Sequence, residues 1–545
     1  MTSQISLYSA DQSKWTEQKQ ARDHSFSLLT VIYALFITVF SLSLELWIQE
    51  RPELDDLRLI FNASMLSVGL AVMVYFYAIL LHPGWLRRIA DWLGNTRIKE
   101  MTHATRATHS SNGAASLYLR LGAVAFGIVA VFYCGLKIYV RIHRKSCKTS
   151  DILGNVLQAL FFFAQMHFIF CNSQMTIVRS CRLAKLGAMH LVAVNLWTWF
   201  RLFLEKQKSA DKHTTSDDRN DNGTNATQES LYLDTKVLMS TCAVEYSLIG
   251  AAIMLVLWMN IGRVDIGHLT LLNHRRKQQM RIDCSASSTG LFVGLIFVLV
   301  TVVDMVITDG RAHVASSFVS WSIHEGLLVF VLLACVACMW RMRRLSYAGG
   351  HRGAVEMLDE ILLIIGLVGE LVFCSIMLLD FFPTTQPTLI PNFSTRDQLM
   401  LFTFNVIRLV QVLLQSLLIL FCTKLVATGR NLEDKPGKQF VTFLLVANVA
   451  LFVLHTYETQ RGTVDGVSFH GSGSNLVVLK AVNPLVIFFR FHSSVCLAHL
   501  WKHAYTAKGM ASRDRSVTDF VLPSRQINSS RIIYIRERAS SVTVW

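Results

Sequence analysis

The chain has 545 residues, of which 52% are hydrophobic and only 16% are charged. A soluble protein of this length usually divides into several domains and carries far more charge, so the composition excludes an ordinary soluble protein. The formal net charge of +15 does not indicate a nucleic-acid binder, because the basic residues lie in loops between apolar runs rather than on one soluble face.

Long apolar runs recur along the chain, separated by polar loops. A helix needs about 20 apolar residues to cross the hydrocarbon core of a bilayer, and about twelve runs reach that length. The sequence therefore predicts an all-α polytopic membrane protein that contacts the lipid bilayer. The expected spans are 27–48, 60–82, 115–140, 152–172, 183–204, 237–261, 287–309, 316–340, 358–382, 399–424, 438–458 and 476–501.

Basic residues orient these spans, because cytosolic loops are enriched in Lys and Arg. The basic clusters fall in alternate loops, which places both termini in the cytosol, and we expect the plasma membrane as the location. One loop, residues 141–148, breaks the rule, because it is basic although the pattern places it outside. The clusters that follow the rule are Arg87/Arg88/Arg97/Lys99, Arg179/Arg182, Arg275/Arg276/Lys277/Arg281, Arg341/Arg343/Arg344 and Lys424/Arg430/Lys435/Lys438.

Glycosylation sequons give an independent indication of this orientation. Asn222 and Asn225 lie in the segment 205–236, and Asn392 lies in a second loop that the charge pattern places outside. All three match the Asn-X-Ser/Thr acceptor pattern of extracellular loops. The segment 205–236 is acidic and rich in Asp, Asn and Thr, which predicts a solvated linker rather than a domain.

With about six spans in each half, both halves begin on the cytosolic side, which predicts a parallel repeat about an axis along the membrane normal. We expect a cytosolic N-terminal segment, a first six-helix half, a cytosolic linker, a second six-helix half and a basic cytosolic tail. Their boundaries are 1–26, 27–262, 263–286, 287–505 and 506–545, with 205–236 as an extracellular loop of the first half.

Short matches between the halves support the repeat. The letters LVA stand shortly before an Asn in both halves, and AVE in the first half corresponds to AVN in the second. A Gln also lies deep in one span of each half. Each half therefore offers three polar residues at comparable depth, namely Gln165, Asn195 and Glu245 in the first half and Gln415, Asn448 and Asn483 in the second.

The amides in these two sets cannot titrate. They can order a file of water and form a narrow polar constriction that refuses hydrated metal ions. Interhelical hydrogen bonding explains any single one of them at least as well. The repetition of the whole set favours the constriction.

Six segments, taken in order, resemble the otopetrin family. The resemblance implies a proton-selective channel that is gated by pH and usually homodimeric, with twelve spans in two six-helix halves and both termini cytosolic. It implies no enzymatic reaction, and we expect no cofactor and no resident metal ion. The segments are HLVAVNLWTW at 190–199, VEYSLI at 244–249, WMNIG at 258–262, GLFVGL at 290–295, PGKQFVTFLLVAN at 436–448 and FFRFHSSVCL at 488–497.

Two titratable residues inside spans match the family segments. Glu245 lies within an apolar run, where a carboxylate must pair, face water or be protonated, and a titrating carboxyl group is what a proton path needs. His492 titrates near neutrality and can relay protons. The structural alternatives are a hydrogen bond to a neighbouring helix for Glu245 and a packed ring for His492. We expect Arg490 to pair with a carboxylate or with backbone carbonyls.

Other polar residues are not matched by these segments. Glu370 either pairs with a base such as Arg408 or is functional. Asp359 and Glu360 begin a helix, where acidic residues ordinarily complement the helix dipole. Three histidines near the outer side are candidates for acid or zinc sensing, although a solvated loop histidine is the simpler reading. They are His313, His455 and His470.

Two further classes of function stay open at this point. A secondary transporter would couple a proton to a small solute, with Glu245 as the coupling site. A structural membrane protein would carry no current. The last residues, 542–545, end in Trp and offer a weak match to a PDZ-type partner.

Overall fold

The structure of the protein is a computed structural model. It describes residues 2–49, 51, 54–77, 84, 88, 91–92, 107–108, 117–143, 149–172, 176–177, 181–216, 225–262, 286–309, 314–347, 354–379, 381, 395–460, 463–464, 467–468 and 474–505. The statements below concern these residues.

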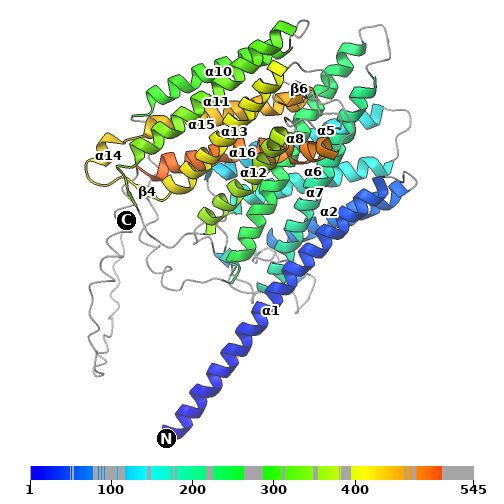
Figure 1. The fold of residues 1–545 in the computed structure, drawn as a ribbon. Coiled ribbons are helices and arrows are strands. Elements are labelled where there is room, and N and C mark those ends of the chain that lie inside the picture. Colours follow the sequence, from blue (N-terminus) through cyan, green and yellow to red (C-terminus); the bar gives the residue numbers. More distant parts are fainter. Residues whose placement is uncertain are drawn as a thin grey trace, which may run out of the picture.

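Twelve long helices make up most of the described chain (Figure 1). The first half holds α1 (Thr2–Gln49), α2 (Asp55–Tyr75), α5 (Leu117–His143), α6 (Thr149–Asn172), α7 (Cys181–Ser216) and α8 (Asn225–Asn260). The second half holds α10 (Ser288–Asp309), α11 (Val314–Met342), α12 (Ala354–Leu379), α13 (Thr395–Cys422), α15 (Lys438–Gln460) and α16 (Ser474–His503). The predicted fold class, an all-α polytopic membrane protein, is confirmed.

The remaining described elements are short. Helix α14 spans Asn431–Asp434. Two-residue strands pair antiparallel as β1 (Ala107–Thr108) with β2 (Thr176–Ile177), β3 (Ser346–Tyr347) with β4 (Leu425–Val426), and β5 (Thr463–Val464) with β6 (Val467–Ser468). These ladders connect helices and do not build a sheet domain.

Eleven of the long helices contain a described stretch that is long and apolar enough to cross a membrane. Helix α7, which contains the predicted span 183–204, is not among them. Its residues 187–195 are all buried against other helices, so lipid does not require this segment to be apolar. The polar content of α7 therefore reflects a helix enclosed by the rest of the bundle.

The segment 205–236 differs from the solvated linker that we expected. Helix α7 continues to Ser216 and α8 begins at Asn225, so helices occupy most of this segment. The physical reason is local, because residues 202–208 (LFLEKQK) consist mainly of strong helix formers that extend α7 past the apolar run.

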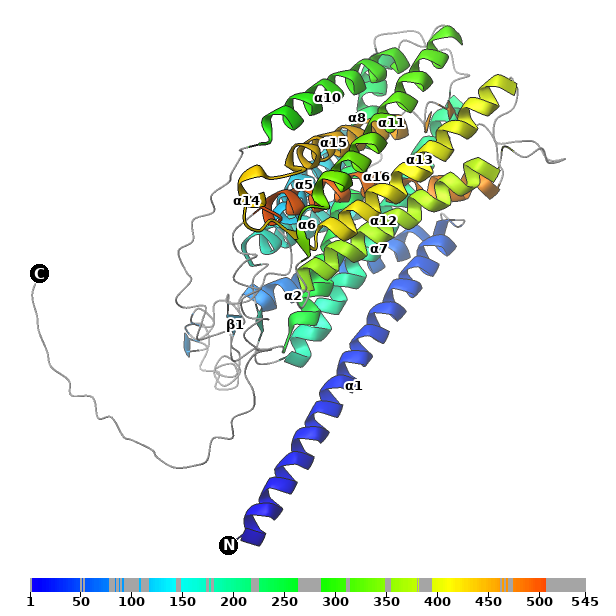
Figure 2. The same cartoon turned by 60° about the vertical axis from the view of Figure 1, so that its left-hand side comes forward.

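The same helix pairs pack in both halves. In the first half they include α1 with α7, α2 with α6, α5 with α8 and α7 with α8. The corresponding pairs in the second half are α10 with α15, α11 with α13, α12 with α16 and α15 with α16. Helices α5 and α8 meet α12 and α16 where the halves join, and the equivalent helices α1 and α10 lie at opposite edges of the molecule (Figures 1 and 2).

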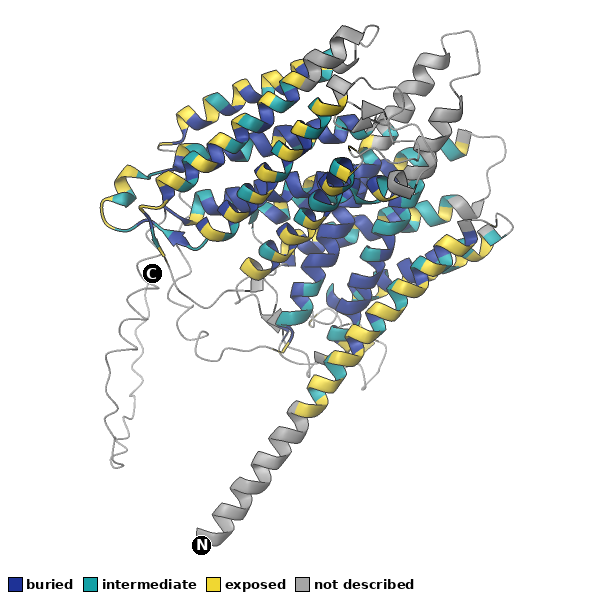
Figure 3. Ribbon diagram, viewed as in Figure 1, coloured by how far each residue is buried: buried dark blue, intermediate teal, exposed yellow. Residues whose placement is uncertain are grey.

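Burial follows the pattern of a membrane protein. Large apolar side chains such as Phe36, Phe292 and Leu333 are exposed on the outer helices, where lipid would cover them (Figure 3). Polar and charged side chains are buried between the helices. Small residues let neighbouring helices approach closely. A Cβ on Gly290 of α10, for example, would overlap the backbone of Gln439 at the start of α15. The candidate functional residues therefore lie inside the bundle.

Candidate functional site

A pair of amide side chains joins α6 to α7 in the first half. Gln165 Nε2 donates to Asn195 Oδ1 at 3.1 Å, and Asn195 Nδ2 donates to Gln165 Oε1 at 3.1 Å. Asn195 Nδ2 also donates to the backbone oxygen of Leu191 at 2.7 Å. Both amides are fully buried, and their reciprocal bonds satisfy polar groups that water cannot reach.

The second half contains the same arrangement between α13 and α15. Gln415 Nε2 donates to Asn448 Oδ1 at 2.8 Å, and Asn448 Nδ2 donates back to Gln415 Oε1 at 3.2 Å. Asn448 Nδ2 donates also to the backbone oxygen of Leu444 at 2.8 Å. The two pairs repeat atom for atom, so the repeat inferred from short sequence matches places equivalent polar groups at equivalent helix contacts.

The third members of the two sets lie on the last helix of each half. Glu245 is buried on α8, five residues before Gly250, and Gly250 packs directly against the Gln165–Asn195 pair. Asn483 on α16 donates to Thr459 Oγ1 at 2.9 Å instead of meeting the amide pair of its half. The structure thus brings the Gln and Asn of each set together, and in the second half it holds Asn483 at a separate contact.

Substitution of Gly250 tests this close approach. A Cβ on Gly250 would lie 2.7 Å from Asn195 Oδ1 and closer still to the Gln165 side chain. We expect Gly250→Ala to cost about 1–3 kcal/mol of unfolding free energy, because the overlap exceeds the usual gain from Ala in a helix. The control is Gly135→Ala on α5, where nothing lies within 4 Å of the new Cβ and the protein should be as stable or slightly more stable. Thermal unfolding of the purified variants measures both, and equal midpoints for them would contradict the packing described here.

The second half also contains a buried chain of charged and polar groups. Arg408 on α13 lies 2.9 Å from the Glu370 carboxylate, and Arg490 on α16 lies 3.3 Å from its other oxygen. Of the alternatives that the sequence left open, the structure shows Glu370 paired with Arg408 and Arg490 paired with a carboxylate. Arg490 also donates to Gln411 at 2.7 Å, and Gln411 donates to Gln415 at 2.9 Å. These contacts therefore link the ion pairs of Glu370 to the Gln415–Asn448 pair of the second half.

Gln411 was absent from the residues selected by sequence. It lies one helical turn before Gln415, a spacing that puts both side chains on the same face of α13. The matching position in the first half is Phe161, four residues before Gln165, and it is buried. The link through Gln411 therefore has no counterpart at the matching described position of the first half, and the repeat alone would not predict it.

His492 lies deep in α16 next to the start of α12. Its Nε2 lies 2.9 Å from the backbone oxygen of Asp359, and its ring stacks on Phe488 with a centroid distance of 5.4 Å. A carbonyl oxygen only accepts, so Nε2 must carry the hydrogen. Among the described residues His492 Nδ1 has no hydrogen-bond partner.

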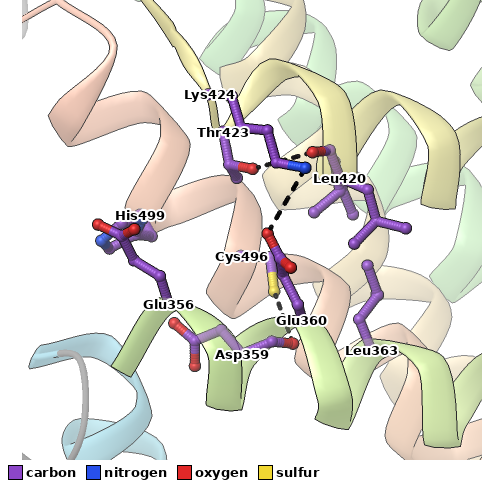
Figure 4. Close-up of a pocket in the computed structure, with 10 residues that line it drawn as sticks. Glu356, Asp359, Glu360, Leu363, Leu420, Thr423, Lys424, Cys496 and His499 are labelled. Atoms are coloured by element: carbon purple, nitrogen blue, oxygen red, sulfur yellow. Dashed lines mark hydrogen bonds and ion pairs between the residues drawn. The ribbon is translucent and has the colours of Figure 1, made fainter. Parts of the chain in front are cut away.

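Asp359 is also one of the residues that line a pocket (Figure 4). Its acidic lining comes from the first turns of α12, and Cys496 and His499 contribute from α16. Lys424 approaches Glu360 at 3.9 Å across the pocket. Three acidic residues at this helix start line the cavity, whereas for Asp359 and Glu360 we expected only dipole complementation. They are Glu356, Asp359 and Glu360.

The remaining candidates divide by position. His455 is buried on α15, and it contacts the ring of His324 rather than solvent. His313 and His470 lie outside the described residues. So do the sequon residues Asn222 and Asn392 and the side chain of Asn225.

This fold defines a polytopic α-helical membrane protein with two similarly packed six-helix halves and polar groups concentrated in its interior. The family model described as Otopetrin matches residues 118–237 and 223–491, so the chain belongs to the otopetrin family. It is similar to "Proton channel OtopLc" of Drosophila melanogaster, with 28% identity over 454 residues that cover 72% of this chain. The chain spans about 28% of the length of that relative. The resemblance carried by the six segments is confirmed.

Proposed function

We propose that this protein is a proton-selective channel that conducts protons passively across the membrane and is gated by pH. The observation that carries the proposal is the pair of buried Gln–Asn contacts, built once in each half of a chain of the otopetrin family. The name of the Drosophila relative supports it. We assign the protein no enzymatic reaction.

The paired amides suit proton passage better than passage of metal ions. Each amide both donates and accepts, so a small rotation lets it hold a water molecule in place of its partner. A proton can move along hydrogen-bonded water, whereas a hydrated metal ion would have to lose its shell in a buried contact that offers few oxygen ligands. We infer that Gln165, Asn195, Gln415 and Asn448 form the constrictions. We infer that Asn483, which bonds to Thr459, lines another part of the path in the second half.

The titratable groups would bind protons beside these constrictions. Glu245 lies on α8, which packs through Gly250 on the first amide pair. His492 in the second half adjoins the acidic pocket, because its ring bonds to the backbone oxygen of Asp359, a residue of the pocket lining. We infer that His492 passes protons to the carboxylates of this pocket, which lie at the end of the bundle where α12 begins and α16 ends.

Ion substitution during an external acid step tests the proposal. Cells that express the chain should carry an inward current on acidification that persists when sodium and chloride are replaced by large impermeant ions. A secondary transporter would instead need its solute for sustained current, and a structural protein would carry none. A current that disappears with sodium or chloride would overturn the proposal.

The topology proposed with this function places both termini in the cytosol of a plasma-membrane protein, and the segment 205–236 outside. Asn222→Gln together with Asn225→Gln should reduce the glycosidase-sensitive mobility shift of the protein on gels, and Asn392→Gln should reduce it further. A terminal epitope tag that antibodies reach on intact cells would contradict the orientation.

The homodimer implied by the family resemblance is tested by light scattering of the purified protein, where a monomeric mass would contradict it.

A further inference from the structure

Four buried titratable side chains meet between three helices of the second half. Asp304 comes from α10, His324 from α11, and His455 and Glu458 from one face of α15. His324 Nδ1 lies 3.5 Å from Asp304 Oδ2 and 3.7 Å from Glu458 Oε1. The rings of His324 and His455 are nearly parallel, with centroids 6.3 Å apart. Ligand-capable atoms of His324, His455 and Glu458 all lie within 4.8 Å of one another.

These separations fit metal ligands better than hydrogen-bond partners. A nitrogen–oxygen hydrogen bond is usually 2.7–3.2 Å long, so the 3.5 and 3.7 Å contacts of His324 Nδ1 are too long for good hydrogen bonds. In a tetrahedral zinc site with bonds of about 2.0–2.2 Å, neighbouring ligand atoms stand about 3.4 Å apart. Among the described residues the buried atoms His324 Nε2 and His455 Nδ1 also have no hydrogen-bond partner.

We propose that His324, His455 and Glu458 bind a divalent transition-metal ion of the zinc type, with Asp304 as a fourth ligand or as the group that orients His324. Two imidazoles and one or two carboxylates are a donor set that suits such ions. This site goes beyond proton conduction, because its occupancy does not depend on whether the chain carries current. It also changes the expectation of no resident metal ion.

Charge balance supports a cation at this place. The guanidinium groups of Arg408 and Arg490 are the positive charges that act on His455. Glu370 pairs with both guanidiniums. With Glu370 the two guanidiniums keep one net positive charge, and the carboxylates of Asp304 and Glu458 add two negative charges. One net negative charge therefore remains to offset part of the charge of a bound divalent ion, which lowers the cost of burying it.

The site lies near one membrane face and joins three helices. Glu458 lies two residues before the end of α15, and Asp304 lies five residues before the end of α10. The ion would enter from this membrane face, which the proposed topology places outside. Once bound, it would tie α10, α11 and α15 together, so the metal should stabilise the folded protein and restrain movement between these helices.

Zinc titration of the purified full-length protein in detergent tests the proposal. Zn²⁺ alone should bind with saturation at one ion per chain, measured by calorimetry, and should raise the midpoint of thermal unfolding. His324→Gln and His455→Gln should each weaken binding at least about ten-fold, and Asp304→Asn about 10–100-fold. The control is His190→Gln on α7, another buried histidine, which hydrogen-bonds Tyr33 and should leave zinc binding unchanged.

A change of ligand type separates coordination from mere folding. His455→Cys supplies a thiolate, which should move the preference of the site from Zn²⁺ toward the softer Cd²⁺ in the same titration. Absence of saturable Zn²⁺ binding to the wild-type protein would overturn the proposal, as would equal zinc binding in wild type, His324→Gln and His455→Gln. Because binding is measured without current, a failure here is distinct from a failure of proton conduction.

Discussion

Glu245→Gln is expected to reach the cell surface at near-normal abundance and to lose most of the proton current. A Gln at this position keeps the size of the side chain and can still donate and accept hydrogen bonds, so a residue that only joins helices would tolerate it. A residue that carries protons would not, because an amide does not bind and release a proton in the working pH range. The measurement is acid-evoked current normalised to surface protein.

Two companion variants sharpen this test. Glu245→Asp retains a carboxyl group and should keep part of the current. Asn483→Asp changes the corresponding residue of the second half, which is already neutral, and should have a milder effect than Glu245→Gln. Wild-type current and pH dependence in Glu245→Gln would reduce Glu245 to a structural residue and leave His492 as the leading titratable candidate.

Glu370→Gln is expected to destabilise the protein by about 3–5 kcal/mol, enough to remove most folded protein from the membrane. Glu370 is fully buried and lies within 3.3 Å of both Arg408 and Arg490. Its loss leaves two guanidinium charges in the interior without the carboxylate that they share. Surface abundance and the thermal unfolding midpoint of the solubilised variant measure the effect.

A carboxylate on the same helix supplies the control. Glu360 also approaches a base, Lys424 at 3.9 Å, but its side chain is 20% exposed. Ion pairs that water reaches contribute about 0–1 kcal/mol, so Glu360→Gln should leave abundance and unfolding nearly unchanged. If Glu370→Gln were as stable as Glu360→Gln, the ion pairs of Glu370 would not hold the second half together.

The sequence predicted the parts of the fold that depend on local composition. Runs of apolar residues marked the helices, because the length of a membrane span is set by the thickness of the bilayer. It also selected the Gln and Asn of each half, since a repeat places equivalent residues at equivalent depths, but it did not predict that these two side chains bond to each other. It misjudged 205–236, where acidic and polar composition indicated a linker although the residues after Leu202 favour helix.

The predictions from sequence were weaker where partners come from distant helices. His455 reads as a solvated histidine near a loop, but α10 and α11 cover it with Asp304 and His324. Nothing in the sequence around His455 encodes these neighbours, which lie more than 100 residues away. The pocket beside Asp359 was missed for the same reason, because α16 supplies its other wall.

The reversal potential of the acid-evoked current shows whether protons carry that current. One pH unit corresponds to 1.36 kcal/mol per proton and 100 mV to about 2.3 kcal/mol per elementary charge, so a proton-selective pore should shift its reversal by about 59 mV per unit of pH gradient. The account predicts this slope across several external pH values, with no change when sodium or chloride is replaced. A reversal potential that stays fixed as the pH gradient changes, or that follows the sodium or chloride gradient, would contradict it.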